Sequence, residues 1–454
     1  MTRILYWNIQ QFGINKINNP NRKRQRGSSL PQPAASDDRK RYILDTLAAN
    51  PVDIFVVVET NTGAGAPGTH VTASGETGAL NLLTEIRIRL GITWRLVPPL
   101  ILGIGGVSEG ISVYYNSANL FFTGPWFWQG GANPAIAPAP PLVGVRYAPP
   151  WRRCLPATPV PAASPINPGI PMNRLAGQWQ FHGPPPVGGG AAPVLQFPGP
   201  NSRTPFLTTF WDTTGAGRTI KLLSYHAPPN SGLAANGTSR LSNILEMTTN
   251  LGANEVGVIV GDFNVDLYSP FAALAYGRLT NMPPLGVGYT RLLNRTTANA
   301  WPDKGYVGTH IKSRHEATPW NTNGYPGYGY IGSSNMFQNY DSIDNALVRY
   351  GTGFGPPPPH NMTIVNRVTG SPYNRVVPAP GGAATPTGNY AYQSAMTPIG
   401  IGANPLDPIA LPLPPPAPGG LVPGNIGGLA RFRGWDNYGH IRSTSDHMAL
   451  IFDV

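Results

Sequence analysis

The segment Val258–Asp266 limits the fold more than any other part of the chain. Its first three residues are apolar and β-branched, which is typical of a strand buried on both faces. Gly261 follows, and Asp262 and Asn264 lie two residues apart, so an extended backbone puts both side chains on one face. A carboxylate and an amide at the end of a buried strand suit a hard metal ion or a phosphate. Gly, Asp and Asn also form ordinary turns, so this segment alone leaves both interpretations open.

Other short apolar segments end or begin at polar residues in the same way. Each such residue on its own also fits a cap or a turn. The residues that flank apolar segments, besides Asp262 and Asn264, are Asn8, Glu59, His226, Asp446 and His447. Asp344 lies inside an apolar segment, and a buried carboxylate needs a partner. Because so many strand ends carry chemically useful groups, we expect a shared site and not a series of unrelated turns.

Helical patterns alternate with these strands. Ser36 begins one pattern that ends before Pro51, and two others cover residues 78–90 and 238–251. No repeat of fixed period is present. The alternation predicts an α/β or α+β protein with two sheets and helices outside them.

Glycine and proline interrupt this pattern over long stretches. The chain of 454 residues contains 55 glycines and 52 prolines, and only 12% of its residues are charged. Such values approach those of low-complexity sequence. We therefore expect one domain with long Gly/Pro-rich loops, not several compact domains.

The net charge of +11 favours a polyanionic partner, either nucleic acid or an anionic lipid surface. A basic cluster in the loop after the Asn8 strand contains Arg22, Lys23, Arg24 and Arg26. Cys154 is the only cysteine, which excludes an intrachain disulfide and a cysteine zinc site. The N-terminus has no apolar signal region and no window is long enough to span a membrane, so a cytoplasmic location, or export without a signal peptide, is expected.

The order of these motifs resembles that of the endonuclease/exonuclease/phosphatase superfamily, the deoxyribonuclease I-like proteins. The matching motifs are Trp7-Asn8, Glu59, Ser224-Tyr225-His226, Gly261-Asp262-Phe263-Asn264, Ser342-Ile343-Asp344 and Ser445-Asp446-His447. The resemblance implies a four-layer α/β/β/α sandwich of two mixed sheets in a single domain, 1–454. The stretches 124–202, 267–340 and 354–428 are longer than the family needs, and we interpret them as insertions.

The resemblance also implies a metal site made of oxygen ligands. Glu59 is expected to be the main ligand of Mg²⁺ or Mn²⁺, with Asn8, Asp262 and Asp446 in or beside its shell. Asn264 is expected to orient the phosphate or the attacking water.

Two histidines are expected to act as acid, base or phosphate-binding groups. His447 is the general base or a transition-state donor, oriented by Asp344. His226 is the second such group, paired with Glu109, and Arg203 resembles the phosphate-binding arginine of deoxyribonuclease I-like enzymes. A carboxylate behind an imidazole fixes its tautomer and favours the imidazolium.

These features predict a metal-dependent nuclease that cuts DNA by attack of an activated water. An alternative is a sphingomyelinase-like or other phosphodiesterase, in which Trp126-Phe127-Trp128 would enter a membrane surface. The region before Asp344 lacks the Trp-Cys-Asp-Arg motif of phosphoinositide phosphatases. A third alternative is a non-catalytic binding protein on the same fold. The sequence leaves open RNA or DNA, endo or exo action, the pathway and the oligomeric state.

Overall fold

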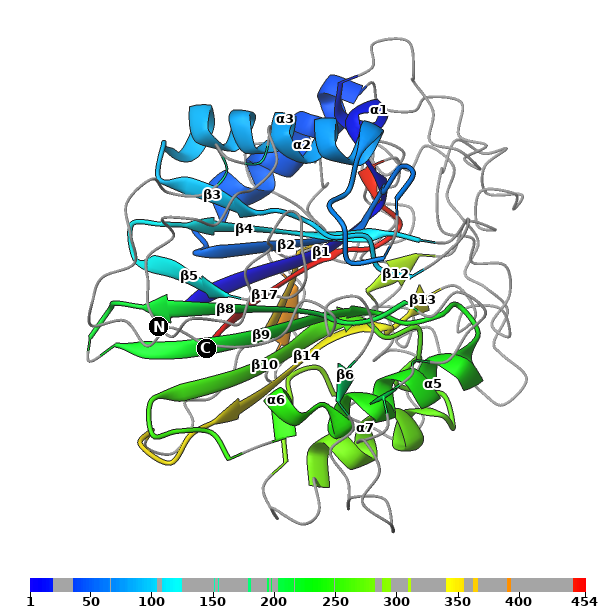
Figure 1. The fold of residues 1–454 in the computed structure, drawn as a ribbon. Helices are drawn as coiled ribbons and strands as arrows, with labels where there is room; N and C mark the ends of the chain where they lie inside the picture. The colour runs from blue at the N-terminus through cyan, green and yellow to red at the C-terminus, as the bar shows by residue number, and fades with distance from the viewer. Residues whose placement is uncertain are drawn as a thin grey trace, which may run out of the picture.

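The structure is a computed structural model whose two sheets and flanking helices are drawn in Figure 1. It describes residues 1–18, 36–65, 67–103, 108–124, 151, 154, 179–180, 194–195, 197, 203–215, 217–248, 250–281, 288–294, 309–311, 340–354, 362–365, 390–392 and 444–454.

The first sheet has seven strands in the order β16-β15-β17-β1-β2-β4-β3. The strands are β1 (Arg3–Phe12), β2 (Ile54–Thr60), β3 (Trp94–Val97), β4 (Gly110–Asn116), β15 (Met362–Val365), β16 (Tyr390–Tyr392) and β17 (Ala449–Asp453). β1 pairs in parallel with β2 and antiparallel with β17, so the sheet is mixed. The central strands are apolar along their length because both faces of this sheet are covered.

The second sheet has six strands in the order β11-β14-β10-β9-β8-β5. The strands are β5 (Leu120–Gly124), β8 (Phe206–Asp212), β9 (Arg218–His226), β10 (Glu255–Asp262), β11 (Thr290–Arg291) and β14 (Asp344–Tyr350). β9 and β10 are parallel, and their register pairs His226 with Asp262. β14 is antiparallel to β10, and its first residue, Asp344, also pairs with Asp262.

Helices cover the outer face of each sheet (Figure 1). On the first sheet they are α1 (Ile14–Ile17), α2 (Ser36–Ala49) and α3 (Ala73–Leu90), and on the second sheet they are α5 (Ser231–Arg240), α6 (Leu245–Thr248) and α7 (Ala272–Asn281). The four layers are helices, sheet, sheet and helices. The predicted α/β/β/α sandwich of two mixed sheets is therefore confirmed.

Aromatic side chains fill the space between the two sheets. The ring of Tyr115 on β4 lies 5.2 Å from that of Phe210 on β8, and the ring of Phe122 on β5 lies 5.8 Å from that of Phe210. All three side chains are buried. Large apolar groups from both sheets thus hold the sandwich together and keep the strand ends in fixed positions.

The predicted helix over residues 238–251 is wrong. The chain instead forms α5, a 3₁₀ turn (Leu241–Asn243) and the short helix α6, and Ile244 between them has an extended backbone. The side chain of Asn230 accepts hydrogen bonds from the backbone N–H groups of Gly232 and Leu233. This cap starts the helix at Ser231, about two helical turns before residue 238, where the apolar pattern suggested that it begins.

The three predicted insertions contain elements of regular structure. These are β6 (Trp179–Gln180), β7 (Val194–Leu195), β12 (His310–Ile311) and α7, with β11 of the second sheet and β15 and β16 of the first sheet. The single-domain boundary and the insertions remain predictions. Arg22, Lys23, Arg24 and Arg26 lie outside the described residues, as does Trp126-Phe127-Trp128. In the described part of the chain, no helix is long and apolar enough to cross a membrane.

Candidate active site

The polar strand ends meet at one edge of the sandwich, opposite the two chain termini (Figure 1). β1 and β2 are parallel, and so are β9 and β10, so each pair brings its carboxyl ends to the same edge. β14 and β17 run the other way and begin there. The sheets therefore fix the positions of the side chains at this edge, where the connecting loops also lie.

Asp262 lies at the centre of this group. Its Oδ2 accepts a hydrogen bond of 3.1 Å from the amide of Asn8, and lies 3.4 Å from His226 Nε2 and 3.6 Å from His447 Nε2. Burial raises the pKa of Asp262, with a further contribution from Asp344, while the two imidazoles oppose this rise. The buried carboxylate therefore lies between two imidazoles.

His447 is fixed from both ends of its side chain and from its backbone. Its Nδ1 lies 2.8 Å from Asp344, whose other oxygen accepts a hydrogen bond of 3.0 Å from the hydroxyl of Tyr6. The backbone N–H of His447 donates to the Ser445 hydroxyl at 2.9 Å, and its carbonyl accepts from the indole of Trp7 at 2.8 Å. These bonds set the ring orientation before any ligand arrives.

The carboxylates around His447 control its charge. Burial on its own would lower the pKa of His447, but Asp344, Asp262 and Asp446 together raise it to about 10. The metal-free site therefore holds this imidazole in the cationic form at neutral pH.

His226 has the same arrangement on the other side of Asp262. Its Nδ1 lies 2.6 Å from Glu109, and Arg203 Nη2 lies 3.6 Å from the second oxygen of that carboxylate. Arg203 Nη1 is 3.2 Å and 3.0 Å from the two ring nitrogens of His226, which places it over the ring face. Burial and Arg203 lower the pKa of His226, but Glu109 and Asp262 outweigh them, and the pKa is raised.

Asn8 and Glu59 form the oxygen-rich side of the site. Asn8 Nδ2 donates to Glu59 Oε1 at 3.0 Å as well as to Asp262, and the backbone N–H of Gln11 donates to Glu59 Oε2 at 3.1 Å. Asn8 Oδ1 is buried and accepts no hydrogen bond among the described residues. A buried amide oxygen beside a carboxylate suits a hard cation, so these residues fit the predicted metal.

Local backbone geometry aims two of these side chains. Glu59 and Asn264 have φ of 62° and 49°, in the left-handed region that residues other than glycine rarely adopt. The pairing of β2 with β4 is irregular between Val57 and Thr60, around Glu59. The Asn264 N–H donates to Asp262 Oδ1 at 2.9 Å, and its amide donates to the carbonyl of Ala227 at 2.9 Å. Such strain and bulges are concentrated at functional sites.

Two residues of this site were not predicted from the sequence. His310, on β12, lies with its ring centroid 4.6 Å from that of His447 and forms an isolated backbone bridge with it. A two-residue strand in a region without periodicity gives no signal for such a position. Tyr6 could have been found, because it lies two residues before Asn8 and so on the same face of β1.

All the predicted catalytic and metal-binding residues lie in this edge region, and their roles remain predictions. Asp446 Oδ1 lies 3.9 Å from His447 Nε2, and Asp446 Oδ2 lies 3.6 Å from His310 Nε2. These contacts place Asp446 beside the histidines. Arg203, predicted as a phosphate-binding residue, contacts Glu109 and His226.

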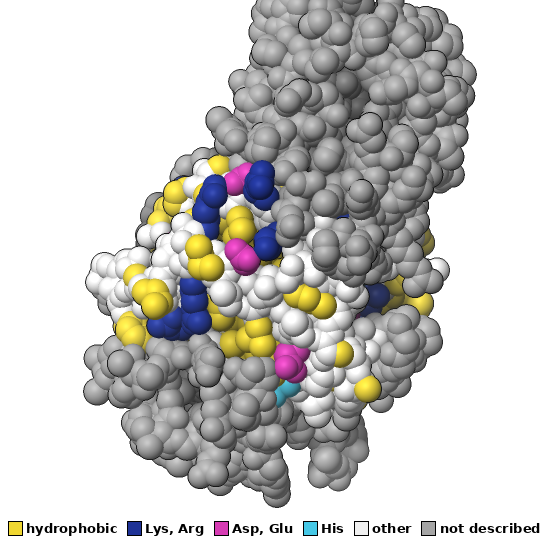
Figure 2. Space-filling view, turned by 90° about the horizontal axis from the view of Figure 1, so that it is seen from above, with side chains coloured by type: hydrophobic (Ala, Val, Ile, Leu, Met, Phe, Trp, Pro, Cys, Tyr) yellow, Lys and Arg dark blue, Asp and Glu magenta, His cyan; other side chains and the backbone are white. Residues whose placement is uncertain are grey.

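The outer face over α2 and α3 carries no continuous basic surface in the part drawn in colour. Figure 2 shows Lys and Arg side chains in separate small groups, with Asp or Glu side chains near several of them. Two of the contacts between these helices are ion pairs, Lys40–Glu85 at 2.9 Å and Arg89–Asp45 at 2.7 Å. The described part of this face therefore does not account for the excess positive charge.

Comparison with known proteins finds similarity among solved structures. The sequence matches no protein-family model and no curated protein sequence. D. rerio TDP2 complexed with a single-strand DNA product has 9% identity and a TM-score of 0.38, over 100% of this chain and 99% of that one. Beta toxin from Staphylococcus aureus has 8% identity and a TM-score of 0.39, over 100% and 99% of the two chains.

A protein described as the endonuclease/exonuclease/phosphatase from Bacteroides vulgatus has 13% identity and a TM-score of 0.36, over 76% of this chain and 86% of that one. With TM-scores below 0.5, these similarities assign no chemistry to this chain, and its chemistry follows from the side chains of the site.

Proposed function

We propose that this chain is a Mg²⁺- or Mn²⁺-dependent phosphodiester hydrolase that cleaves nucleic acid, with DNA as its substrate. The observation that carries the proposal is the position of Asp262 Oδ2, 3.4 Å from His226 Nε2 and 3.6 Å from His447 Nε2. Each imidazole has a second carboxylate behind Nδ1, Glu109 or Asp344. This set provides one proton acceptor and two cationic donors around one point, as attack of water on a phosphodiester requires.

The metal would be held by Glu59 and by Asn8 Oδ1, with Asp262 and Asp446 close to its shell. When bound, Mg²⁺ or Mn²⁺ supplies positive charge to a non-bridging phosphate oxygen. Asn8 is well placed for this role because its Oδ1 is buried and accepts no bond from the described residues. Hydration water would complete the shell, as is usual for Mg²⁺.

The protein's own residues divide the proton transfers between them. Asp262 accepts a proton from the attacking water, since it is the carboxylate that both imidazoles face. His447 and His226 donate hydrogen bonds to the phosphate oxygens as charge develops there, because the raised pKa of each favours the imidazolium. Arg203 adds a further positive charge over His226, and Asn264 helps to orient the phosphate or the water.

Support for DNA over other phosphodiesters comes from charge. The chain carries a net charge of +11, and polyanions bind such proteins with strong dependence on salt. The basic residues Arg22, Lys23, Arg24 and Arg26, in the loop after β1, are proposed to contact the backbone phosphates. No described residue favours the membrane-active alternative.

The test compares nicking of supercoiled plasmid with hydrolysis of sphingomyelin vesicles, each in the presence of Mg²⁺. We expect plasmid nicking that His447→Ala abolishes, with no release of phosphocholine. Hydrolysis of sphingomyelin without nicking would replace the proposed substrate with the lipid. Absence of both activities in a folded wild-type protein would favour a non-catalytic binding protein.

A further inference from the structure

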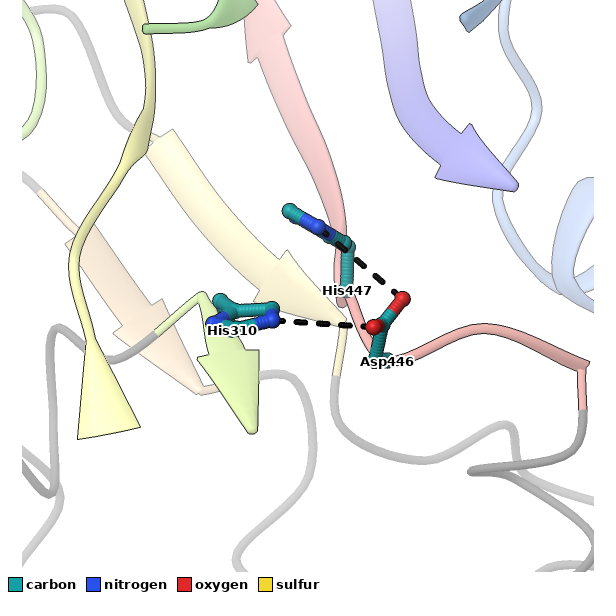
Figure 3. A group of neighbouring side chains, drawn as sticks. All are labelled: His310, Asp446 and His447. Atoms are coloured by element: carbon teal, nitrogen blue, oxygen red, sulfur yellow. Dashed lines mark ion pairs between the residues drawn. The ribbon is translucent and has the colours of Figure 1, made fainter. Parts of the chain in front are cut away.

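His310 enters the site on β12, and the chemistry proposed above does not use it. Its Nε2 lies 3.6 Å from Asp446 Oδ2, while His447 Nε2 lies 3.9 Å from Asp446 Oδ1. Figure 3 shows the Asp446 carboxylate beside both rings, with an ion-pair contact drawn to each. The Asp446 carboxylate therefore lies between two imidazole nitrogens, with one oxygen toward each.

The separations of these three groups are informative. The two distances from Asp446 to the imidazole nitrogens are both longer than a hydrogen bond, in which nitrogen and oxygen approach within about 3.2 Å. Two ligands that share one tetrahedral Zn²⁺ ion, at bond lengths near 2.1 Å, lie about 3.4 Å apart. One ligand atom from each of His310, Asp446 and His447 can be chosen so that all three lie within 4.8 Å of one another. A small movement of these side chains would bring all three atoms onto one ion.

A carboxylate also lies behind each imidazole. Asp344 is 2.8 Å from His447 Nδ1, and Asp341 is 3.7 Å from His310 Nδ1. In metal sites a histidine ligand commonly donates its second ring N–H to a carboxylate, which fixes the tautomer that leaves Nε2 as the ligand. The side chains of His310, His447 and Asp446 are 19%, 5% and 11% exposed, so little water competes for their ligand atoms.

We propose that His310, Asp446 and His447 form a binding site for a borderline transition-metal ion, of which Zn²⁺ is the representative, adjacent to the Asn8–Glu59 site for Mg²⁺. Imidazole nitrogen suits Zn²⁺ and similar ions, whereas Mg²⁺ prefers an all-oxygen shell. Three protein ligands leave one tetrahedral position for water.

Occupation of this site has a consequence that rests on the proposed function. His447 Nε2 is the atom that faces Asp262 in the hydrolytic arrangement, 3.6 Å away. A nitrogen bound to zinc cannot carry a proton. Zinc should therefore inhibit the Mg²⁺-supported reaction by removing the imidazolium donor.

The test measures Zn²⁺ binding by calorimetry in excess Mg²⁺, with protein that carries no polyhistidine tag. Co²⁺ serves as a second probe, because four-coordinate Co²⁺ absorbs visible light far more strongly than the six-coordinate ion. We expect one site in the wild-type protein. His310→Ala should lose it, and Asp341→Asn should weaken it by about 10-fold or more.

Glu59→Gln is the matched control, because it alters the oxygen site and leaves the three proposed zinc ligands in place. Unchanged zinc affinity in a folded His310→Ala protein would overturn the proposal. Loss of zinc binding in the control variant Glu59→Gln, with binding retained in His310→Ala, would also overturn it. Zinc binding that requires His310, in a protein without hydrolase activity, would support this site and contradict the proposed function. Inhibition is measured for each variant against its own zinc-free rate.

Discussion

The two histidines of the active site are oriented in the same way. Each directs Nε2 toward Asp262 and has a carboxylate at Nδ1, Glu109 for His226 and Asp344 for His447. Both pairs were expected from the sequence through its resemblance to the deoxyribonuclease I-like proteins. The sequence did not predict His310, since the fold alone brings that residue next to His447.

Replacement of the carboxylate behind His447 should change the pH dependence of hydrolysis. Asp344 helps to raise the pKa of His447 to about 10, so Asp344→Asn should let the imidazole lose its proton at lower pH. If His447 acts as a cationic donor, the alkaline limb of kcat/KM moves down by about 1 to 3 pH units. Profiles at saturating Mg²⁺ measure this. Asp341→Asn, whose carboxylate faces His310, is the control, and an alkaline limb that stays in place in Asp344→Asn would contradict the donor role.

At the scale of elements, irregular pairing of β1 and β2 aims the metal-binding side of the site. The register between them shifts between Asn8 and Phe12, and Gln11 in this bulge has φ of 52°. The Gln11 N–H bonds to Glu59, which itself has φ of 62°. The positions of the two strands follow from their apolar runs, but nothing in those runs indicates a bulge.

Substitution of Gln11 tests whether this bulge holds Glu59 in place. A β-branched residue is strained at positive φ, so Gln11→Val should lower the free energy of unfolding by about 1 to 3 kcal/mol and weaken Mg²⁺ binding. Gln11→Gly keeps the backbone donor and removes the strain, so it should remain within about 1 kcal/mol of the wild type. Thermal denaturation and calorimetry measure both effects. Equal free energies of unfolding and equal Mg²⁺ binding in the two variants would show that the backbone conformation of Gln11 does not hold Glu59 in place.

The helices illustrate what sequence patterns could and could not provide. α7 buries Ala272, Ala275, Tyr276 and Leu279, an i, i+3, i+4, i+7 pattern that identifies a helix. That signal was present in the sequence, although the stretch was interpreted as part of an insertion. The break after α5 was harder to predict, because Asn230 caps the helix early and the apolar pattern continues past its end.

At the scale of the whole molecule, a buried polar contact joins the two sheets away from the active site. The Thr2 hydroxyl, just before β1, donates to Asp212 at the end of β8, and Arg218 on β9 binds both residues, at 2.8 Å and 3.0 Å. Burial on its own would raise the pKa of Asp212, but the hydrogen bonds from Thr2 and Thr214 and the charge of Arg218 lower it. The sequence did not predict this contact between the sheets, because such contacts depend on how the two sheets pack.

Asp212→Asn should therefore destabilise the protein in a pH-dependent manner. A carboxylate with a lowered pKa in the folded state stabilises it above the unfolded pKa of about 3.9, and this effect disappears as pH falls through the folded pKa. We expect a loss of about 1.5 to 3 kcal/mol near neutral pH that shrinks in acid. Denaturant titration at several pH values measures the loss.

The exposed pair Arg3–Asp453 is the control for this effect, since its side chains are 44% and 29% exposed. Asp453→Asn should cost no more than about 1 kcal/mol. Equal losses in the two variants would mean that the buried link contributes no more than a surface ion pair.

In the proposed mechanism, Glu59 and Asn8 hold the metal for a hydrolytic site built around Asp262. The most direct test is the rate of plasmid nicking as a function of Mg²⁺ concentration, for the wild-type protein and for Glu59→Gln. We predict a wild-type rate that rises with Mg²⁺ and saturates, and a rate lower by about 100-fold or more in Glu59→Gln. Nicking that proceeds without a divalent metal, or at the wild-type rate in Glu59→Gln, would contradict the account.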